Sequence, residues 1–441
     1  SRPECKQAWK KGKVDHHFDF KAGYGEFYQK LQREGCVKEW TVLVYMAADN
    51  DLFPYALWDL YEMEAAFKTS HSAGSTIKTD LLVQVDGPDN DDLRRIHVFS
   101  GPVSYSAKRK SDFENASLDD VRSPVAERLS EKKKVTEQKR LSEFLDWGAT
   151  YYPAKNYMVI VWGHGQGWKA YPVKKPVKGR LLDDRKLETT FPAPETDESF
   201  GGIAFKKSTG SWLDIPGLRA ALASFQVYIG KPVDVYASDS CLMQMAEVAH
   251  EIAPQARYIV GSAQIQTFLG LPYRRLLFEL NKGSFDGVKK TGGAGDEAFL
   301  MAKMIPKLMR KSLDPRRGLQ GRNEKEAQKF MTSSSLNGDE LGNRLIPKMR
   351  KLSAALVDFL DEDENRLLDM RFVVQKVPSF EGGAQDLGVF LSFLDLLLFE
   401  ERQKNGELSR AAEKLKDAVI AADEALERSI VSYAYGQNYG V

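Results

Sequence analysis

The residues best suited to chemistry are a cysteine and a histidine that each follow an apolar run. Cys241 follows residues 233–237 (VDVYA), and His164 follows residues 157–162 (YMVIVW). A thiol and an imidazole that lie close together form the dyad of nucleophilic catalysis. The two residues are far apart in the chain, so this interpretation requires a fold that brings them together.

His164 stands between Gly163 and Gly165, directly after an apolar run. Glycine lets the backbone approach a ligand closely, because it has no side chain. The pattern fits a ligand-binding turn, and it fits equally well a tight turn with an incidental histidine.

Cys241 precedes a helical pattern at residues 242–252, and the N-terminus of a helix can stabilise a thiolate. Taken alone, a free cysteine is more often a small buried hydrophobic residue. With His164 nearby it becomes a candidate nucleophile, and the amides of Gly165 and Cys241 become candidate donors to an oxyanion. Asp239 is either a turn residue or, in a cleft, a carboxylate for a cationic side chain.

The elements that must position these residues alternate between apolar runs and helical patterns. Buried strands are predicted at residues 40–47, 78–85, 93–99, 157–162, 233–237 and 258–262, with the second and third forming a hairpin. Such alternation predicts an α/β sheet with helices on both faces, where chemistry collects at the carboxyl ends of the strands.

Asp49, Asn50 and Asp51 end the first apolar run, and a helical pattern follows at residues 52–67. Asp and Asn are common at the starts of helices, because their side chains accept hydrogen bonds from free backbone amides. We therefore interpret these three residues as helix-capping residues.

The pattern changes at about residue 276, after which amphipathic helical stretches dominate, at residues 299–312, 345–359, 387–399 and 408–432. We expect three parts: an N-terminal arm at residues 1–36, an α/β domain at residues 37–275, and a helical C-terminal region at residues 276–441.

Composition excludes several classes of protein. Among 441 residues, Lys and Arg number 63 and Asp and Glu number 62, so a net charge of +1 gives no reason to expect nucleic acid or an anionic membrane. No apolar run approaches the roughly 18 residues of a membrane span. We therefore expect no membrane span.

Three cysteines, without a CxxC pair, are too few for a disulfide scaffold or a structural zinc site. Cys5 and Cys36 either pair or stay free. Pairing would leave Cys241 as the odd thiol and imply an oxidising compartment.

Four stretches, in order, are WTVLVYMAADNDL, VWGHGQGW, GGIAFKKSTGSWLDIPGLRAAL and YASDSCLMQMAEVAHEI. Together they resemble the clostripain family of cysteine peptidases, which belongs to the same clan as caspases, gingipains and legumain. The resemblance extends from about residue 40 to residue 273, and more weakly through the helical half, for instance at QDLGVF.

This resemblance implies a caspase-like α/β/α sandwich with a mostly parallel central sheet. It also implies a His–Cys dyad at His164 and Cys241 and cleavage of proteins or peptides after Arg or Lys. Asp239 occupies the family's acidic position beside the nucleophile, which is associated with that basic preference. A catalytically inactive binding protein on the same fold is the alternative function. A metal-dependent hydrolase is a weaker rival, because the sequence has no HExxH cluster.

Maturation in the family proceeds by self-cleavage at a basic residue between the His and Cys motifs. Here residues 169–200 form a long polar connection rich in prolines and basic residues. It is either an ordinary surface loop or a segment that covers the cleft until it is cut, with Lys178, Arg180 and Arg185 as candidate cleavage sites. We expect the cleaved fragments to stay associated.

No cofactor is expected. Some relatives depend on calcium, but Lys206 and Lys207 stand where relatives often carry an acidic pair, which weakens that expectation. Residues 86–92 lack the ligand spacing of an EF-hand, so no metal site is assigned. The chain begins at Ser1, and a removed signal peptide would agree with a secreted or periplasmic bacterial protein.

Overall fold

The computed structural model describes residues 36–65, 73–76, 78–89, 92–100, 113, 116–129, 135–171, 200–283, 296–312, 329, 331–380 and 383–436. The candidate cleavage sites Lys178, Arg180 and Arg185 lie outside the described residues, as does Cys5. Cys36 is disulfide-bonded, whereas Cys241 is a free thiol.

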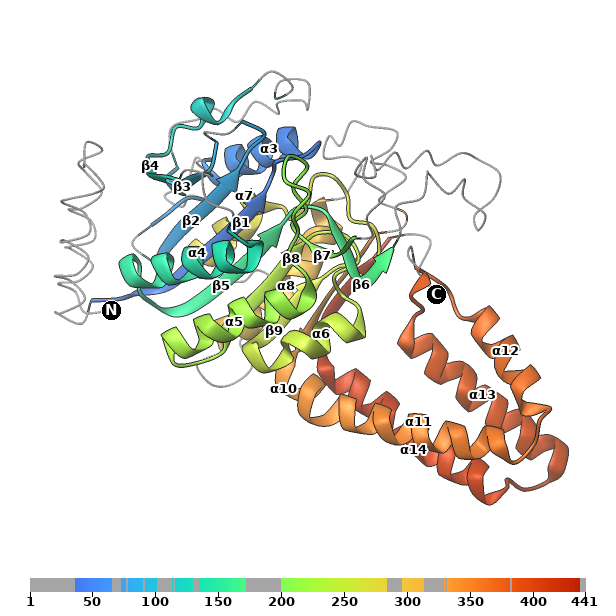
Figure 1. The fold of residues 1–441 in the computed structure, drawn as a ribbon. Helices are drawn as coiled ribbons and strands as arrows, with labels where there is room; N and C mark the ends of the chain where they lie inside the picture. The colour runs from blue at the N-terminus through green and yellow to red at the C-terminus, as the bar shows by residue number, and fades with distance from the viewer. Residues whose placement is uncertain are drawn as a thin grey trace.

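A nine-stranded sheet runs through the molecule in the order β11-β10-β9-β8-β5-β1-β2-β3-β4 (Figure 1). Its strands are β1 (Lys38–Ala47), β2 (Thr79–Asp86), β3 (Arg94–His97), β4 (Val125–Arg128), β5 (Ala154–Trp162), β8 (Val233–Asp239), β9 (Ala256–Gly261), β10 (Thr332–Asn337) and β11 (Ile430–Tyr435). The central strands β2, β1, β5, β8 and β9 are parallel, and the flanking strands pair antiparallel. A second, two-stranded sheet joins β6 (Gly165–Tyr171) to β7 (Phe200–Ile203).

Helices cover both faces of the large sheet. The first face carries α3 (Phe53–Met63), α7 (Tyr273–Lys282) and α8 (Glu297–Ser312), and the second carries α4 (Glu137–Tyr151), α5 (Ile215–Ile229) and α6 (Ala246–Ile252). Side chains of a strand alternate between the faces, so Val42 and Val44 of β1 pack in the first core and Leu43 and Tyr45 in the second. The expected α/β/α sandwich with a mostly parallel central sheet is confirmed.

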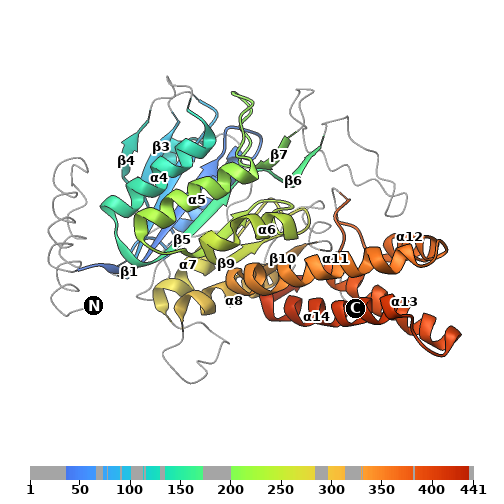
Figure 2. The same cartoon turned by 60° about the horizontal axis from the view of Figure 1, so that its bottom comes forward.

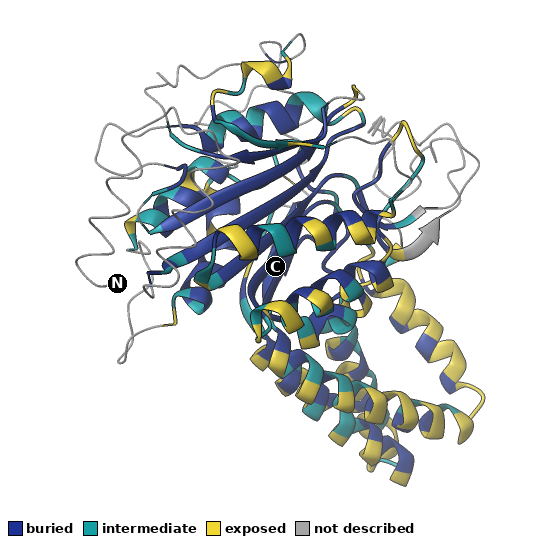
Figure 3. Cartoon of the chain, turned by 60° about the vertical axis from the view of Figure 1, so that its left-hand side comes forward, coloured by how far each residue is buried: buried dark blue, intermediate teal, exposed yellow. Residues whose placement is uncertain are grey.

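The central strands β1, β2 and β8 of this sandwich are almost entirely buried, whereas the C-terminal helices show exposed stripes (Figure 3). These helices are α10 (Gly338–Glu340), a π-helical turn (Leu341–Leu345), α11 (Ile346–Asp361), α12 (Arg366–Lys376), α13 (Leu387–Asn405) and α14 (Arg410–Ser429). The longer ones form a separate small core and project from the sandwich (Figures 1 and 2). Short 3-10 turns occur at Leu118–Asp120 and Ala253–Gln255.

The sheet continues past residue 275, where the sequence pattern predicted helices only. Strands β10 and β11 come from the C-terminal part of the chain and extend the sheet beyond β9. β10 is the serine-rich segment TSSSLN, which has little of the apolar character that marks the other strands. None of the helices in the described ranges is both long and apolar enough to cross a bilayer.

Candidate active site

The candidate residues His164 and Cys241 follow neighbouring strands. β5 and β8 are parallel and adjacent, with Trp162 opposite Asp239 at their carboxyl ends. His164 and Cys241 come two residues after this pair, so the topology places both at the same edge of the sheet.

The two loops are in direct contact. The hydroxyl of Ser240 donates to the carbonyl of Gly163 at 2.7 Å. A Cβ atom on Gly165 would lie 2.4 Å from the carbonyl oxygen of Cys241, which is too close for any side chain. The second glycine around His164 is therefore needed because the backbone of Cys241 lies against it.

Cys241 lies in a turn, and not at a helix start. α6 begins only at Ala246, so the predicted helix at residues 242–252 is wrong in its first turn. Leu242 has a φ of +61°, a left-handed conformation that side chains other than glycine rarely adopt. Strain of this kind collects at functional sites, where the surrounding structure enforces it.

The Sγ atom of Cys241 accepts a hydrogen bond from the backbone amide of Gln266 at 3.3 Å. Burial raises the pKa of the Cys241 thiol to about 11, and the nearby charge of Asp239 adds to the rise, whereas the Gln266 amide opposes it. Stabilisation of a thiolate thus comes from a backbone amide of the loop after β9 and not from a helix N-terminus.

His164 has a carboxylate partner that the sequence interpretation missed. Its Nε2 atom lies 2.8 Å from Oδ1 of Asp51, which follows β1. Burial tends to raise the pKa of Asp51, but the hydrogen bond and charge of His164 outweigh it, so this pKa lies below its ordinary value. Asp51 is therefore ionised at neutral pH and holds the imidazole ring in one orientation.

The turn that carries Asp51 is built by its neighbour. Asn50 donates to the carbonyl oxygens of Ala47 and Phe205 at 3.0 and 2.8 Å and accepts from the amide of Leu52 at 2.9 Å. The N-cap residue of α3 is Leu52, without a side-chain cap. The capping interpretation is thus wrong for Asp51, and the available sequence signal was an acidic residue just after an apolar run.

Asp239 is buried, with 4% of its surface exposed. Its carboxylate accepts from the amide of Leu271 at 3.0 and 3.1 Å, from the hydroxyl of Tyr273 at 2.8 Å and from the side-chain amide of Gln266. A Cβ atom on Gly270 would lie 2.7 Å from both carboxylate oxygens, and its φ of +56° suits glycine. Burial raises the pKa of Asp239 to about 6, although the three donors lower it.

A second buried carboxylate, Asp59 of α3, lies on the same face of the sheet. The indole of Trp162 donates to its Oδ2 atom at 2.8 Å, and its Oδ1 atom has no hydrogen-bond partner. Burial raises the pKa of Asp59 well above its ordinary value, and the charge of Asp239 raises it further. The only sequence signal was an acidic residue within the apolar face of the helix FPYALWDLYEM.

Lys206 is fully buried on the opposite face of the sheet, at the same edge. Its ammonium group pairs with Asp86 at the end of β2 and with Oε1 of Glu137 at 3.2 Å. The other oxygen of Glu137 accepts from the hydroxyl of Tyr45 at 2.6 Å. The next residue, Lys207, donates its backbone amide to the carbonyl of Asp49. Lys206 is therefore a positive partner of both carboxylates, and Nε of Arg140 also lies 3.7 Å from Oε1 of Glu137.

No metal centre emerges from the part of the chain that the structure describes, since no three of its His, Cys, Asp and Glu residues are placed to hold an ion together.

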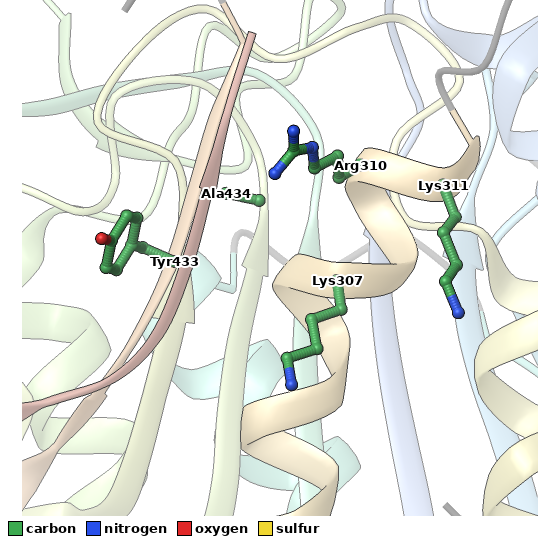
Figure 4. Close-up of a pocket in the computed structure, with 5 residues that line it drawn as sticks. All are labelled: Lys307, Arg310, Lys311, Tyr433 and Ala434. Atoms are coloured by element: carbon green, nitrogen blue, oxygen red, sulfur yellow. The ribbon is translucent and has the colours of Figure 1, made fainter. Parts of the chain in front are cut away.

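A separate cavity of about 510 Å³ lies between α8 and the edge strand β11 (Figure 4). It is lined by Lys307, Arg310, Lys311, Tyr433 and Ala434. Arg310 extends toward Ala434, whereas Lys311 points to the other side of the helix. Because the cations do not converge, we assign no ligand to this cavity.

Comparison with protein families places this site in context. Residues 44–200 and 192–292 match the model of the clostripain family. Clostripain from Hathewaya histolytica is 23% identical over 278 residues, which are 58% of this chain and 43% of clostripain. The chain therefore spans less than half the length of this curated relative.

Solved structures share the fold. A secreted cysteine protease from Bacteroides thetaiotaomicron, in complex with an irreversible peptide inhibitor, has a TM-score of 0.53 at 19% identity, over 90% of this chain and 84% of that one. An inactive zymogen protease from Parabacteroides distasonis has a TM-score of 0.53 at 16% identity, over 91% and 84%. With the family model matching more than half of its residues, the chain belongs to the clostripain family of cysteine peptidases.

Proposed function

We propose that this protein is a cysteine endopeptidase that cleaves proteins and peptides after Arg or Lys, with Cys241 as nucleophile and His164 as its partner. The observation that carries the proposal is the contact between the two loops, in which Ser240 bonds to Gly163 and Gly165 lies against Cys241. The two loops follow adjacent parallel strands, β5 and β8, in a chain that belongs to the clostripain family.

In the proposed reaction the Cys241 thiol gives its proton to His164, and its sulfur attacks the carbonyl carbon of the scissile bond; after the amine leaves, water hydrolyses the thioester and restores the thiol. The amides of Gly165 and Cys241 hold the oxyanion. Because ionised Asp51 accepts the Nε2–H of His164, Nδ1 is the nitrogen that delivers a proton to the leaving amine. Asp51 stabilises the imidazolium ion and does not itself change protonation.

The preference for a basic P1 residue is assigned to Asp239. This carboxylate lies two residues before the nucleophile and is buried, so an arginine side chain that reaches it forms a charge-assisted, bidentate pair. A substrate with a basic P1 residue is then preferred because it brings the positive charge that pairs with Asp239.

Maturation by self-cleavage is proposed for the connection between β6 and β7. Its described ends, Tyr171 and Phe200, are partners in the two-stranded sheet. A cut anywhere in residues 172–199 leaves β5 on one fragment and β8 on the other, still joined by their parallel pairing. The fragments therefore stay associated through the shared core.

Secretion is the proposed location. The disulfide at Cys36 requires an oxidising compartment, and one structural relative is a secreted protease.

Hydrolysis of a fluorogenic peptide with Arg at P1 tests the function directly. Wild-type protein should cleave it, also in the presence of a chelator, and Cys241→Ala should abolish cleavage while keeping the wild-type melting temperature. Iodoacetamide should label Cys241 in the folded protein. A folded but inactive wild type would favour the binding-protein alternative, and insensitivity to the chelator would dismiss the metal-dependent hydrolase.

Self-cleavage is tested by incubating the protein alone and sequencing the new N-termini. Wild type should separate into two fragments that co-elute in gel filtration, whereas Cys241→Ala should remain one chain. A variant in which alanine replaces all the basic candidates should convert and gain activity slowly; these are Lys175, Lys178, Arg180, Arg185 and Lys186. Full activity of that variant as a single chain would contradict the zymogen proposal.

A further inference from the structure

One residue connects the candidate nucleophile to the candidate specificity carboxylate. The backbone amide of Gln266 donates to Sγ of Cys241 at 3.3 Å, and its side-chain amide donates to Oδ1 of Asp239. Gln266 is 8% exposed, so its carboxamide fills space beside the buried carboxylate. The resting site is thus closed by a side chain of the loop that follows β9.

Of the three groups that donate to Asp239, Gln266 is the easiest to move. The Leu271 amide is part of the backbone, held where Gly270 packs against the carboxylate. The Tyr273 hydroxyl is held by a fully buried ring at the start of α7. Gln266 instead presents its amide on a side chain with rotatable bonds, so a ligand can replace it while the backbone stays in place.

The charge of this pocket favours such a replacement. Trp162 and Asp239 are cross-strand partners facing α3 and α7, and Asp59 binds the indole of Trp162. Within the described residues, neither Asp59 nor Asp239 forms an ion pair with a lysine or arginine. Gln266 gives Asp239 a hydrogen bond but no positive charge, whereas a guanidinium group gives both.

We propose that Gln266 is a specificity-determining residue, whose carboxamide occupies the place of the P1 cation in the resting enzyme and is displaced by that cation. This inference rests on the proposed preference for basic P1 residues. A neutral P1 side chain cannot compensate Asp239 and leaves Gln266 in place, so the competition itself discriminates among substrates.

Displacement of the carboxamide also reaches the nucleophile. The backbone amide of Gln266 keeps its hydrogen bond to Sγ, because only the side chain moves. The P1 cation meanwhile balances the charge of Asp239, which otherwise opposes ionisation of the Cys241 thiol. When the P1 cation displaces the Gln266 side chain, it therefore both binds Asp239 and eases ionisation of the Cys241 thiol.

Equilibrium binding to Cys241→Ala protein tests the inference without turnover. The probes are a tetrapeptide amide that ends in Arg and its counterpart that ends in norleucine, measured by calorimetry. Gln266→Ala in this background should tighten binding of the Arg peptide several-fold and leave the norleucine peptide unchanged. Gln266→Met, which keeps the length of the side chain but cannot donate to Asp239, should also tighten it.

Gln264→Ala is the matched control, since it alters the same loop at a residue that is not among the hydrogen-bond partners of Asp239. In the Cys241→Ala background, Gln264→Ala protein should bind the Arg peptide as tightly as Cys241→Ala protein does. In the catalytically active protein, Gln266→Ala should lower KM for Arg substrates and leave kcat within about two-fold.

The outcomes separate the inference from the function on which it rests. If the parent binds Arg and norleucine peptides equally, the basic preference fails and the inference with it. If the parent prefers Arg but neither Gln266 variant binds it more tightly, the displacement inference alone is overturned. A thermal melt of each variant confirms that the compared proteins are folded.

Discussion

Two buried clusters of charge lie at the same edge of the sheet, on opposite faces. On the face of α4, the ammonium of Lys206 lies between Asp86 and Glu137. On the face of α3 and α7, the donors to Asp59 and Asp239 within the described residues are all neutral. The first cluster thus includes a cation, whereas the described part of the second does not.

This difference suggests different roles for the two clusters: the Lys206 cluster stabilises the fold, and the Asp59–Asp239 cluster is suited to substrate binding. Burying carboxylates away from water is unfavourable unless a cation or several donors compensate them. Lys206 is a cation within its own cluster, and its chain neighbour Lys207 donates its amide to Asp49 in the segment that bears Asp51. Asp59 and Asp239 receive hydrogen bonds but, within the described residues, no ion pair with Lys or Arg, and burial raises the pKa of both groups. Such a cluster is suited to a cation that comes from a substrate.

Removing the internal cation should have the largest effect. Lys206→Met keeps the length of the side chain but removes the ammonium group that pairs with both Asp86 and Glu137, so the free energy of unfolding should fall by about 3–5 kcal/mol. Denaturant unfolding measures the loss. The adjacent Lys207→Met, at an exposed position, should change stability little. Equal stability of the two variants would contradict a structural role for the Lys206 cluster.

Removing the charge of Asp239 in the Asp59–Asp239 cluster should weaken the cleavage of Arg substrates and leave folding intact. Asp239→Asn keeps the shape of the side chain but removes the charge that pairs with a P1 cation, so kcat/KM for Arg substrates should fall by on the order of 10²-fold or more. Steady-state kinetics with Arg and norleucine substrates measure the effect. An unchanged ratio between the two substrates, or a preference for Asp or a large apolar residue at P1, would remove Asp239 from the specificity site.

Asp51 lies at the same edge of the sheet, where it holds His164. Asp51→Asn retains a hydrogen-bond acceptor for His164 but loses its charge, so kcat should fall by about tenfold while KM for an Arg substrate stays constant. Asp51→Glu restores the charge and should recover part of kcat. If KM changed and kcat did not, Asp51 would act on substrate binding and not on the histidine.

The smallest effect concerns the carboxylate of Asp59, which has no cationic partner within the described residues. A carboxyl whose pKa is raised by folding retains its proton longer in the folded state, so it lowers stability as pH rises from its ordinary value of 3.8. Asp59→Asn removes this dependence. The variant should therefore gain stability relative to wild type as pH increases from about 4 to about 7, by about 1–2 kcal/mol at neutral pH.

Thermal melts across this pH range measure the gain, and the same variant should bind the Arg peptide less tightly. A stability difference that is constant with pH would show that the Asp59 carboxyl does not titrate in the folded protein as its buried position implies.

The strands and helices of the structure agree only in part with those predicted from the sequence. Apolar runs alternating with helical patterns predicted the central strands, because a buried parallel strand is apolar on both faces. The same patterns missed β10, whose serines pair with β9 and β11 in spite of their weak strand character. The predicted helix after Cys241 begins later, because a strained turn at Leu242 intervenes.

The sequence by itself determined the family and identified His164, Cys241 and Asp239 as candidates, because these residues stand in local motifs at the ends of predicted strands. Only the tertiary structure decided which other residues reach them. Asp51 approaches His164 because β1 lies beside β5 in the sheet, and Gln266 approaches Asp239 because β9 lies beside β8. Strand order and the face toward which each side chain points are properties of the packed sheet, so chain order does not reveal them.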